Sequence, residues 1–142
     1  MNRRHILLIY QLLIGASDTS TGLLLLAAPT LTLHLMGLHP AAAALPYLSY
    51  IGAFVLSVGL ACFYGAFLTT HPLYAAKLEV VWLLTAITRA SVSCFVLTQI
   101  STGTLETGWL TVALSDGAIA LIQFTGLARG WLTRGWLRDV LS

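Results

Sequence analysis

An arginine lies near the centre of a long apolar segment. Residues 75–100 form a run long enough to cross a bilayer as a helix, and Arg89 is fourteen residues into it. An arginine at the bilayer centre costs about 2.5–3.5 kcal/mol by the lowest scales. It is tolerated where the side chain faces a protein interior or an aqueous cavity and finds a partner there. The partners of Arg89 therefore constrain how the rest of the chain folds.

The composition predicts an all-α polytopic membrane protein. Of the 142 residues, 58% are hydrophobic and only 8% are charged, whereas a soluble domain carries about 25% charged residues. Four apolar runs account for the high hydrophobic content, and the connections between these runs are short. We therefore expect a single integral membrane domain, residues 1–142, folded as an antiparallel bundle of four transmembrane helices. The predicted spans are residues 6–28, 45–68, 75–100 and 107–128.

Three segments outside or at the ends of these spans need separate treatment. The N-terminus resembles the start of a signal peptide, but its apolar run continues past Asp18, so we expect a retained first span. Residues 30–38 are apolar but too short to cross, which predicts an interfacial or re-entrant segment. Residues 129–142 combine arginines with Trp131 and Trp136, which favours an amphipathic tail on the membrane surface.

The basic residues predict the orientation. With four crossings, every Lys and Arg other than Arg89 falls on one side, whereas the other side has Glu106, His34 and His39. The positive-inside rule then places both termini in the cytoplasm. We expect a multi-pass protein of a bacterial plasma membrane, which is the inner membrane where there are two. The basic residues are Arg3, Arg4, Lys77, Arg129, Arg134 and Arg138.

Two aspartates share the predicted depth of Arg89. Counted from the cytoplasmic boundary of each span, Asp18 and Asp116 lie twelve residues in and Arg89 fourteen. At the rise of an α-helix these counts correspond to about 18–21 Å. A guanidinium can bind two carboxylates through its fork of N–H donors. The sequence therefore predicts an intramembrane cluster of Asp18, Arg89 and Asp116.

Further small and polar residues lie on the same helix faces. Four polar residues, each one or two turns from a member of the cluster, are expected to extend it into a seam: Gln11, Thr85, Ser93 and Gln123. The second span has small residues at every fourth position, which predicts close helix packing: Ala53, Ser57, Ala61 and Gly65. Glu79, near the cytoplasmic end of the third span, is interpreted as an interface residue, with a proton entry point as the alternative.

The cluster has two interpretations. Buried ion pairs can fix which helices pack together. Alternatively, two acids beside one base leave one carboxylate without a counter-charge, and that group could hold a proton or bind a polar ligand. The sequence leaves both open.

Several kinds of chemistry lack the residues that they need. All four histidines lie near span ends, so a haem held by two histidines in the bundle core is not expected. Cys62 and Cys94 lie on different spans and are interpreted as small hydrophobic residues. The sequence has no phosphate-binding glycine loop, nucleophile elbow or zinc-protease motif, and no basic patch for nucleic acid. We expect a non-enzymatic protein with no catalytic residue, cofactor or metal site.

Three functions remain compatible with this pattern. The first is an accessory or structural subunit, or scaffold, whose partners are the lipid bilayer and either other membrane subunits or further copies of the chain. The second is a proton-coupled transporter of a small molecule, working as a homo-oligomer. In size, span count and a single acid in the first span the chain resembles the small multidrug exporters, although it shares no motif with them. The third is binding of lipid or pigment between helices, to which the apolar faces and tryptophans point: Trp82, Trp109, Trp131 and Trp136.

Overall fold

The computed structural model describes residues 3–39, 41–70 and 75–132, and these form helices and turns with no strand. The elements are α1 (Arg3–Ala27), α2 (Pro29–Leu35), the short 3-10 helix η1 (Ala42–Ala44), α3 (Leu45–Leu68), α4 (Ala75–Ser101), the 3-10 helix η3 (Thr107–Trp109) and α5 (Leu110–Ala128). Four stretches are long and apolar enough to cross a membrane: Arg4–Ala27, Ala42–Leu68, Ala75–Ser101 and Thr107–Ala128. The predicted helical class is thus confirmed, as is the expectation of four helices long and apolar enough to span a membrane.

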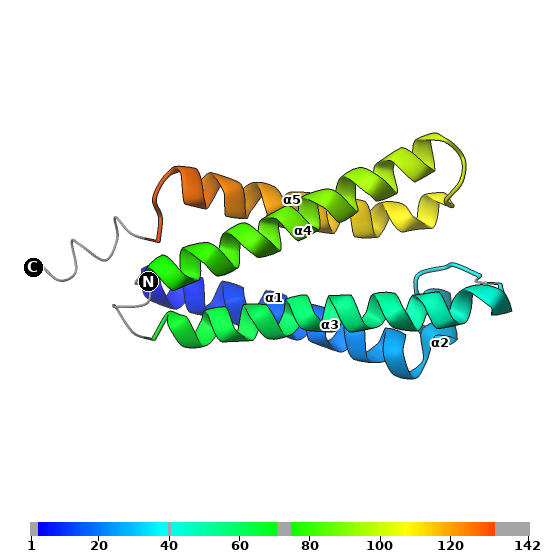
Figure 1. Cartoon of the computed structure of the whole chain (residues 1–142), viewed down its shortest axis with the longest axis horizontal. Helices are drawn as coiled ribbons and strands as arrows, with labels where there is room; N and C mark the ends of the chain where they lie inside the picture. Colours follow the sequence, from blue (N-terminus) through cyan, green and yellow to red (C-terminus); the bar gives the residue numbers. More distant parts are fainter. Residues whose placement is uncertain (1–2, 40, 71–74, 133–142) are drawn as a thin grey trace, which may run out of the picture.

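The four long helices form two antiparallel pairs. α1 packs along α3 and α4 packs along α5, while α3 and α4 make a smaller contact that joins the pairs (Figure 1). α1 begins and α5 ends at the same end of the bundle, where Arg4, Lys77 and Arg129 also lie. We call this end the basic end. The other end holds α2 and the connection between α4 and α5.

The contact between α1 and α3 depends on glycines. A Cβ atom at Gly22 would lie 2.5 Å from the backbone nitrogen of Leu56, and one at Gly59 would lie 2.5 Å from the Thr19 hydroxyl. The two backbones therefore approach so closely that no larger side chain fits at these positions. Such close approach is a common means of packing helices in membranes, where burying apolar surface gives little net gain.

Most of the small-residue stripe predicted on the second span lies outside this interface, and only Gly65 faces α1, against Gln11. Ala53 and Ser57 are exposed, Ala61 is half-buried, and Gly65 alone is buried. Positions spaced every four residues drift around a helix that has 3.6 residues per turn, whereas positions alternating three and four apart keep facing a neighbour. The buried residues of α3 that follow the second pattern are Leu48, Gly52, Gly59, Cys62 and Ala66.

The basic end is closed by a hydrophobic cluster. Leu68, Leu78 and Trp82 pack together with Leu132, which lies beyond the end of α5. The chain reaches this position because Gly130 adopts a positive φ of 62° and the N–H of Trp131 donates to the Gly126 carbonyl at 2.9 Å. This pattern ends many helices at glycine.

Arg4 also ties two helices together at the basic end. Its Nε donates to the carbonyl of Thr69 at 2.8 Å, and its guanidinium also bonds the carbonyl of Thr70. The bond joins the first turn of α1 to carbonyls just beyond the end of α3, which have no partner within the helix. Of the predicted surface tail, residues 133–142 lie outside the described residues.

The segment after the first span does not cross the bundle. α2 is only seven residues long and packs against α1 and α3 at the end opposite the basic end. Leu33 and Leu38 are buried there with Leu48, and Trp109 packs against them. This short helix agrees with the expectation of a segment that does not span the bilayer.

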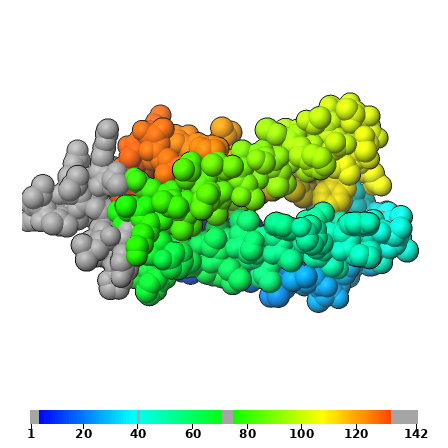
Figure 2. Space-filling view, in the orientation of Figure 1, coloured from blue at the N-terminus to red at the C-terminus, as the bar shows by residue number. Residues whose placement is uncertain are grey.

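α3 and α4 diverge away from the basic end (Figure 1), although Trp109 brings the two helix pairs together again at the other end. Figure 2 shows an opening between α3 and α4 in this half of the molecule, whereas the two helices touch nearer the basic end.

Candidate functional site: an ion triad between the helix pairs

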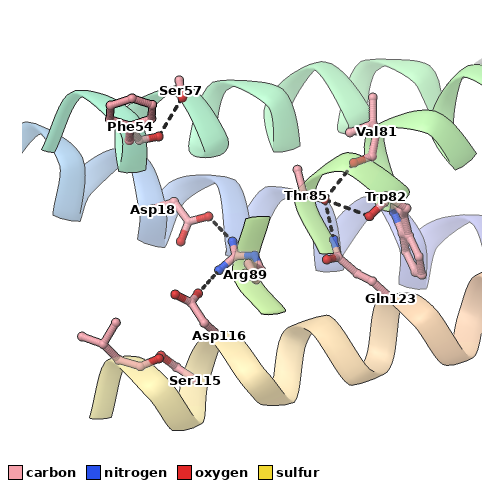
Figure 3. Close-up of polar contacts among 11 residues, drawn as sticks. Asp18, Phe54, Ser57, Val81, Trp82, Thr85, Arg89, Ser115, Asp116 and Gln123 are labelled. Atoms are coloured by element: carbon pink, nitrogen blue, oxygen red, sulfur yellow. Dashed lines mark hydrogen bonds and ion pairs between the residues drawn. The ribbon is translucent and has the colours of Figure 1, made fainter. Parts of the chain in front are cut away.

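Arg89 is the centre of an ion triad formed with Asp18 and Asp116. One guanidinium nitrogen donates to Asp116 Oδ1 at 2.5 Å, and the other donates to Asp18 Oδ2 (Figure 3). The Arg89 side chain is only 4% exposed. The structure thus brings together the three ionisable residues that the sequence places at one depth.

The two ion pairs join different parts of the fold. Arg89 lies on α4, Asp116 on its hairpin partner α5, and Asp18 on α1 of the other helix pair. The Asp116 contact is therefore within one pair, whereas the Asp18 contact crosses between the pairs. A single guanidinium connects three of the four long helices.

The fourth long helix reaches Arg89 through a cysteine. Cys62 of α3 is fully buried and close enough to the guanidinium to interact with it electrostatically. This proximity was not predictable from the sequence, because a lone cysteine in an apolar run is ordinarily a small hydrophobic residue. All four long helices therefore contribute a side chain at this depth.

The triad has more negative than positive groups, and its two carboxylates are partly exposed. Two carboxylates surround one guanidinium, so the fully ionised triad carries a net charge of −1. Each carboxylate uses one oxygen toward Arg89, and the Asp18 and Asp116 side chains are 15% and 19% exposed. The remaining oxygens are thus available for a proton or for a hydrogen-bond donor.

The residues of the predicted polar seam form separate hydrogen bonds rather than one continuous network. Gln123 Nε2 donates to Thr85 Oγ1 at 2.9 Å, and the Thr85 hydroxyl donates in turn to the Val81 carbonyl at 2.8 Å (Figure 3). On the other side of Arg89, Ser93 donates to the Ala113 carbonyl at 2.7 Å. These bonds join α4 to α5 and make their pairing specific.

Two other predicted residues lie away from these bonds. Gln11 is fully buried on α1, and neither atom of its amide has a hydrogen-bond partner within the described part of the chain. Glu79 is half-buried and ten residues before Arg89, which corresponds to about 15 Å along α4. Glu79 is therefore separate from the triad.

No metal-binding group is found within residues 3–39, 41–70 and 75–132, where no three His, Cys, Asp or Glu side chains gather suitably. The rings of His34 and His39 lie 5.2 Å apart near α2. Two imidazoles without a third ligand fall short of the usual zinc site. His71 lies outside the described residues.

The fold and the triad define a class: an all-helical chain with four helices able to cross a membrane, linked by buried charges at mid-depth. No family model, curated protein or solved structure matches the chain.

Proposed function

We propose that this chain is a non-enzymatic structural or accessory protein of a membrane complex, and that the ion triad holds its two helix pairs in register. It acts as a scaffold whose partners are other membrane subunits or further copies of itself. The ion triad is the observation that supports this proposal, because its charged side chains bind one another and thereby join different helices. The connections between its helices are short, so these connections offer little surface to a partner outside the bilayer.

We further propose that the basic end faces the cytoplasm of a bacterial cell. Arg4, Lys77 and Arg129 gather at this end, whereas Glu106 and two histidines lie near the other. Positively charged residues are retained on the cytoplasmic side during insertion. This arrangement supports a plasma membrane location with both chain ends inside.

The contact between the helix pairs is sparse. α3 and α4 make only a small interface, and an opening separates them over part of their length (Figure 2). Removing one partner of a buried ion pair commonly costs about 3–5 kcal/mol, because the other charge is left buried without compensation. A contact of this size is enough to decide whether two weakly packed helix pairs remain docked.

A second candidate is a proton-coupled transporter of a small molecule, working as a homo-oligomer. The specific observation in its favour is the partial exposure of Asp18 and Asp116, each with one oxygen not bound to Arg89. A carboxylate that exchanges a proton beside an opening could couple that proton to a ligand. An arginine at the same depth would favour an anionic ligand over a cationic one.

Proton flux and assembly separate the two candidates. The protein is purified in a mild detergent, its oligomeric state and companions are recorded, and it is reconstituted into liposomes that contain a pH-sensitive dye. The scaffold proposal predicts no proton flux above that of empty liposomes, with or without added small anions, and disrupted assembly for Asp18→Asn. Ligand-dependent proton flux that Asp18→Asn abolishes while assembly stays normal would overturn the scaffold proposal in favour of the transporter.

A further inference from the structure

A second polar layer lies two helical turns from the triad, toward the basic end. Gln11 precedes Asp18 by seven residues on α1, and Trp82 precedes Arg89 by seven on α4. On α5, which runs the opposite way, Gln123 follows Asp116 by seven. Seven residues are nearly two full turns, so each helix places its two polar residues on one face, about 10 Å apart.

Three of the four residues of this second layer are buried, and the fourth, Tyr10, is half-buried. Gln11 and Gln123 have no exposed surface and Trp82 is 1% exposed. The rings of Tyr10 and Trp82 lie with their centroids 5.3 Å apart, which joins α1 to α4, and Gln123 bonds Thr85, one turn from Trp82. Gly65 and Gly126 make room, since a Cβ atom there would overlap the Gln11 amide or the Trp82 ring.

Five polar atoms of this layer have no hydrogen-bond partner among the described residues. They are the Tyr10 hydroxyl, both amide atoms of Gln11, the Trp82 indole nitrogen and the Gln123 amide oxygen. Leaving such a group unpaired in an apolar environment costs roughly 1–3 kcal/mol. In a bilayer the lipid cannot supply the missing bonds. Five unpaired atoms on four side chains of one layer therefore point to small hydrogen-bonding molecules within this layer.

The chemistry of the layer identifies the kind of molecule. The Trp82 N–H donates, the Gln123 oxygen accepts, and the Gln11 amide and Tyr10 hydroxyl can do both. No member of the layer is charged, so an ion would be a poor ligand. Leu68, Leu78 and Leu132 close the layer toward the basic end, and the triad lies on its other side. A small neutral molecule that both donates and accepts hydrogen bonds matches this enclosed set.

We propose that the layer formed by Tyr10, Gln11, Trp82 and Gln123 is an internal hydration site, in which ordered water joins α1 to α4 and α5. A buried water makes about three hydrogen bonds, so about two waters would satisfy the five groups. This site supplements the triad as a link between the helix pairs. The proposal does not depend on whether the protein is a scaffold or a transporter.

Hydroxyl-radical labelling in lipid nanodiscs tests this hydration site. X-rays generate hydroxyl radicals from water next to a side chain, and both Tyr10 and Trp82 have reactive rings. We expect both rings to be oxidised in the folded protein at least fivefold faster than Tyr64. Tyr64 is the matched control, because it lies beside Gly65 at a similar depth but is exposed to lipid. Oxidation of Tyr10 and Trp82 no faster than that of Tyr64 would overturn the proposal.

A second measurement detects the water directly in the wild-type protein, and variants of the layer serve only to assign the signal and as a control. In ¹⁵N-tryptophan-labelled protein, a water-bound indole N–H of Trp82 shows a magnetisation-transfer peak to water, and Trp82→Phe identifies its signal. We expect this peak in the wild-type protein and its loss in a Gln11→Leu, Gln123→Leu double variant that retains the other tryptophan signals. A wild-type Trp82 signal without transfer to water would show that the layer is dry.

Discussion

Arg89 shows what a single charge can specify inside an apolar fold. Its depth along the sequence was enough to predict Asp18 and Asp116 as partners, because an uncompensated charge in a bilayer is costly and few partners lie at that depth. The proximity of Cys62 was not predictable, since a thiol in an apolar run gives no sign of a charged neighbour. The sequence also could not predict that each carboxylate binds Arg89 through one oxygen, because this depends on side-chain rotamers.

Replacement of Arg89 should destabilise the protein strongly. Arg89→Gln leaves two carboxylates buried beside each other, and we expect a loss of about 3–5 kcal/mol in the free energy of unfolding. Arg89→Lys keeps the charge but lacks the planar fork, so its loss should be smaller. Steric-trapping measurements in bicelles give these free energies. Glu106→Gln, at an exposed carboxylate away from the triad, is the matched control and should change stability little; wild-type stability in Arg89→Gln would contradict the structural role.

The helix pairs show where a pattern in the sequence misleads. The stripe containing Ala53 and Ser57 has the composition of a packing face, yet these residues are exposed and Gly52 and Gly59 make the close approach. Both sets contain small residues on one helix, so composition alone could not choose between them. The choice depends on the direction of α1 across α3, which only the packed structure supplies.

Bulk added at Gly22 should separate α1 from α3. In Gly22→Leu even the first added carbon would lie 2.5 Å from the backbone of Leu56, so one helix must move. We expect a loss of roughly 1–3 kcal/mol, the usual cost of overpacking. Ala53→Leu adds a similar volume at an exposed position of α3 and should leave unfolding unchanged. Equal effects of the two variants would show that the glycine contact is not the interface.

The two aspartates should stabilise different contacts between helices. Asp116→Asn weakens a contact inside the α4–α5 pair, whereas Asp18→Asn weakens the contact between pairs. Spin labels at two lipid-exposed sites, Ser57 on α3 and Ser91 on α4, report the distance between the pairs by electron paramagnetic resonance. We expect a broader distance distribution for Asp18→Asn than for Asp116→Asn. A distribution broadened equally by both variants would contradict this division of roles.

At the scale of the whole molecule, composition and length already predicted the fold class. Four apolar runs with short connections leave little choice beyond sequential antiparallel helices, and the helix bounds follow the predicted spans closely. The divergence of α3 from α4 and the unpaired polar layer at Gln11 and Trp82 were not predictable. They depend on how helix faces meet rather than on where helices begin and end.

The orientation of the whole molecule can be tested from outside the cell. In a Cys94→Ala background, cysteines are introduced at Thr70, near the basic end, and at Thr104, in the connection between α4 and α5; both sites are exposed. Cys62 is retained because it is fully buried. With a membrane-impermeant maleimide on intact cells, we expect labelling at position 104 and not at position 70. The reverse pattern would place the basic end outside.

The central claim is that Asp18 and Arg89 stabilise the protein through each other, across the two helix pairs. A double-mutant cycle measures this directly: the free energies of unfolding of the wild type, Asp18→Asn, Arg89→Gln and the double variant are compared in the same bicelles. We predict that the double variant loses less stability than the two single losses together, with a coupling energy on the order of 1–3 kcal/mol. Losses that simply add would show that the two residues act independently and would contradict the account.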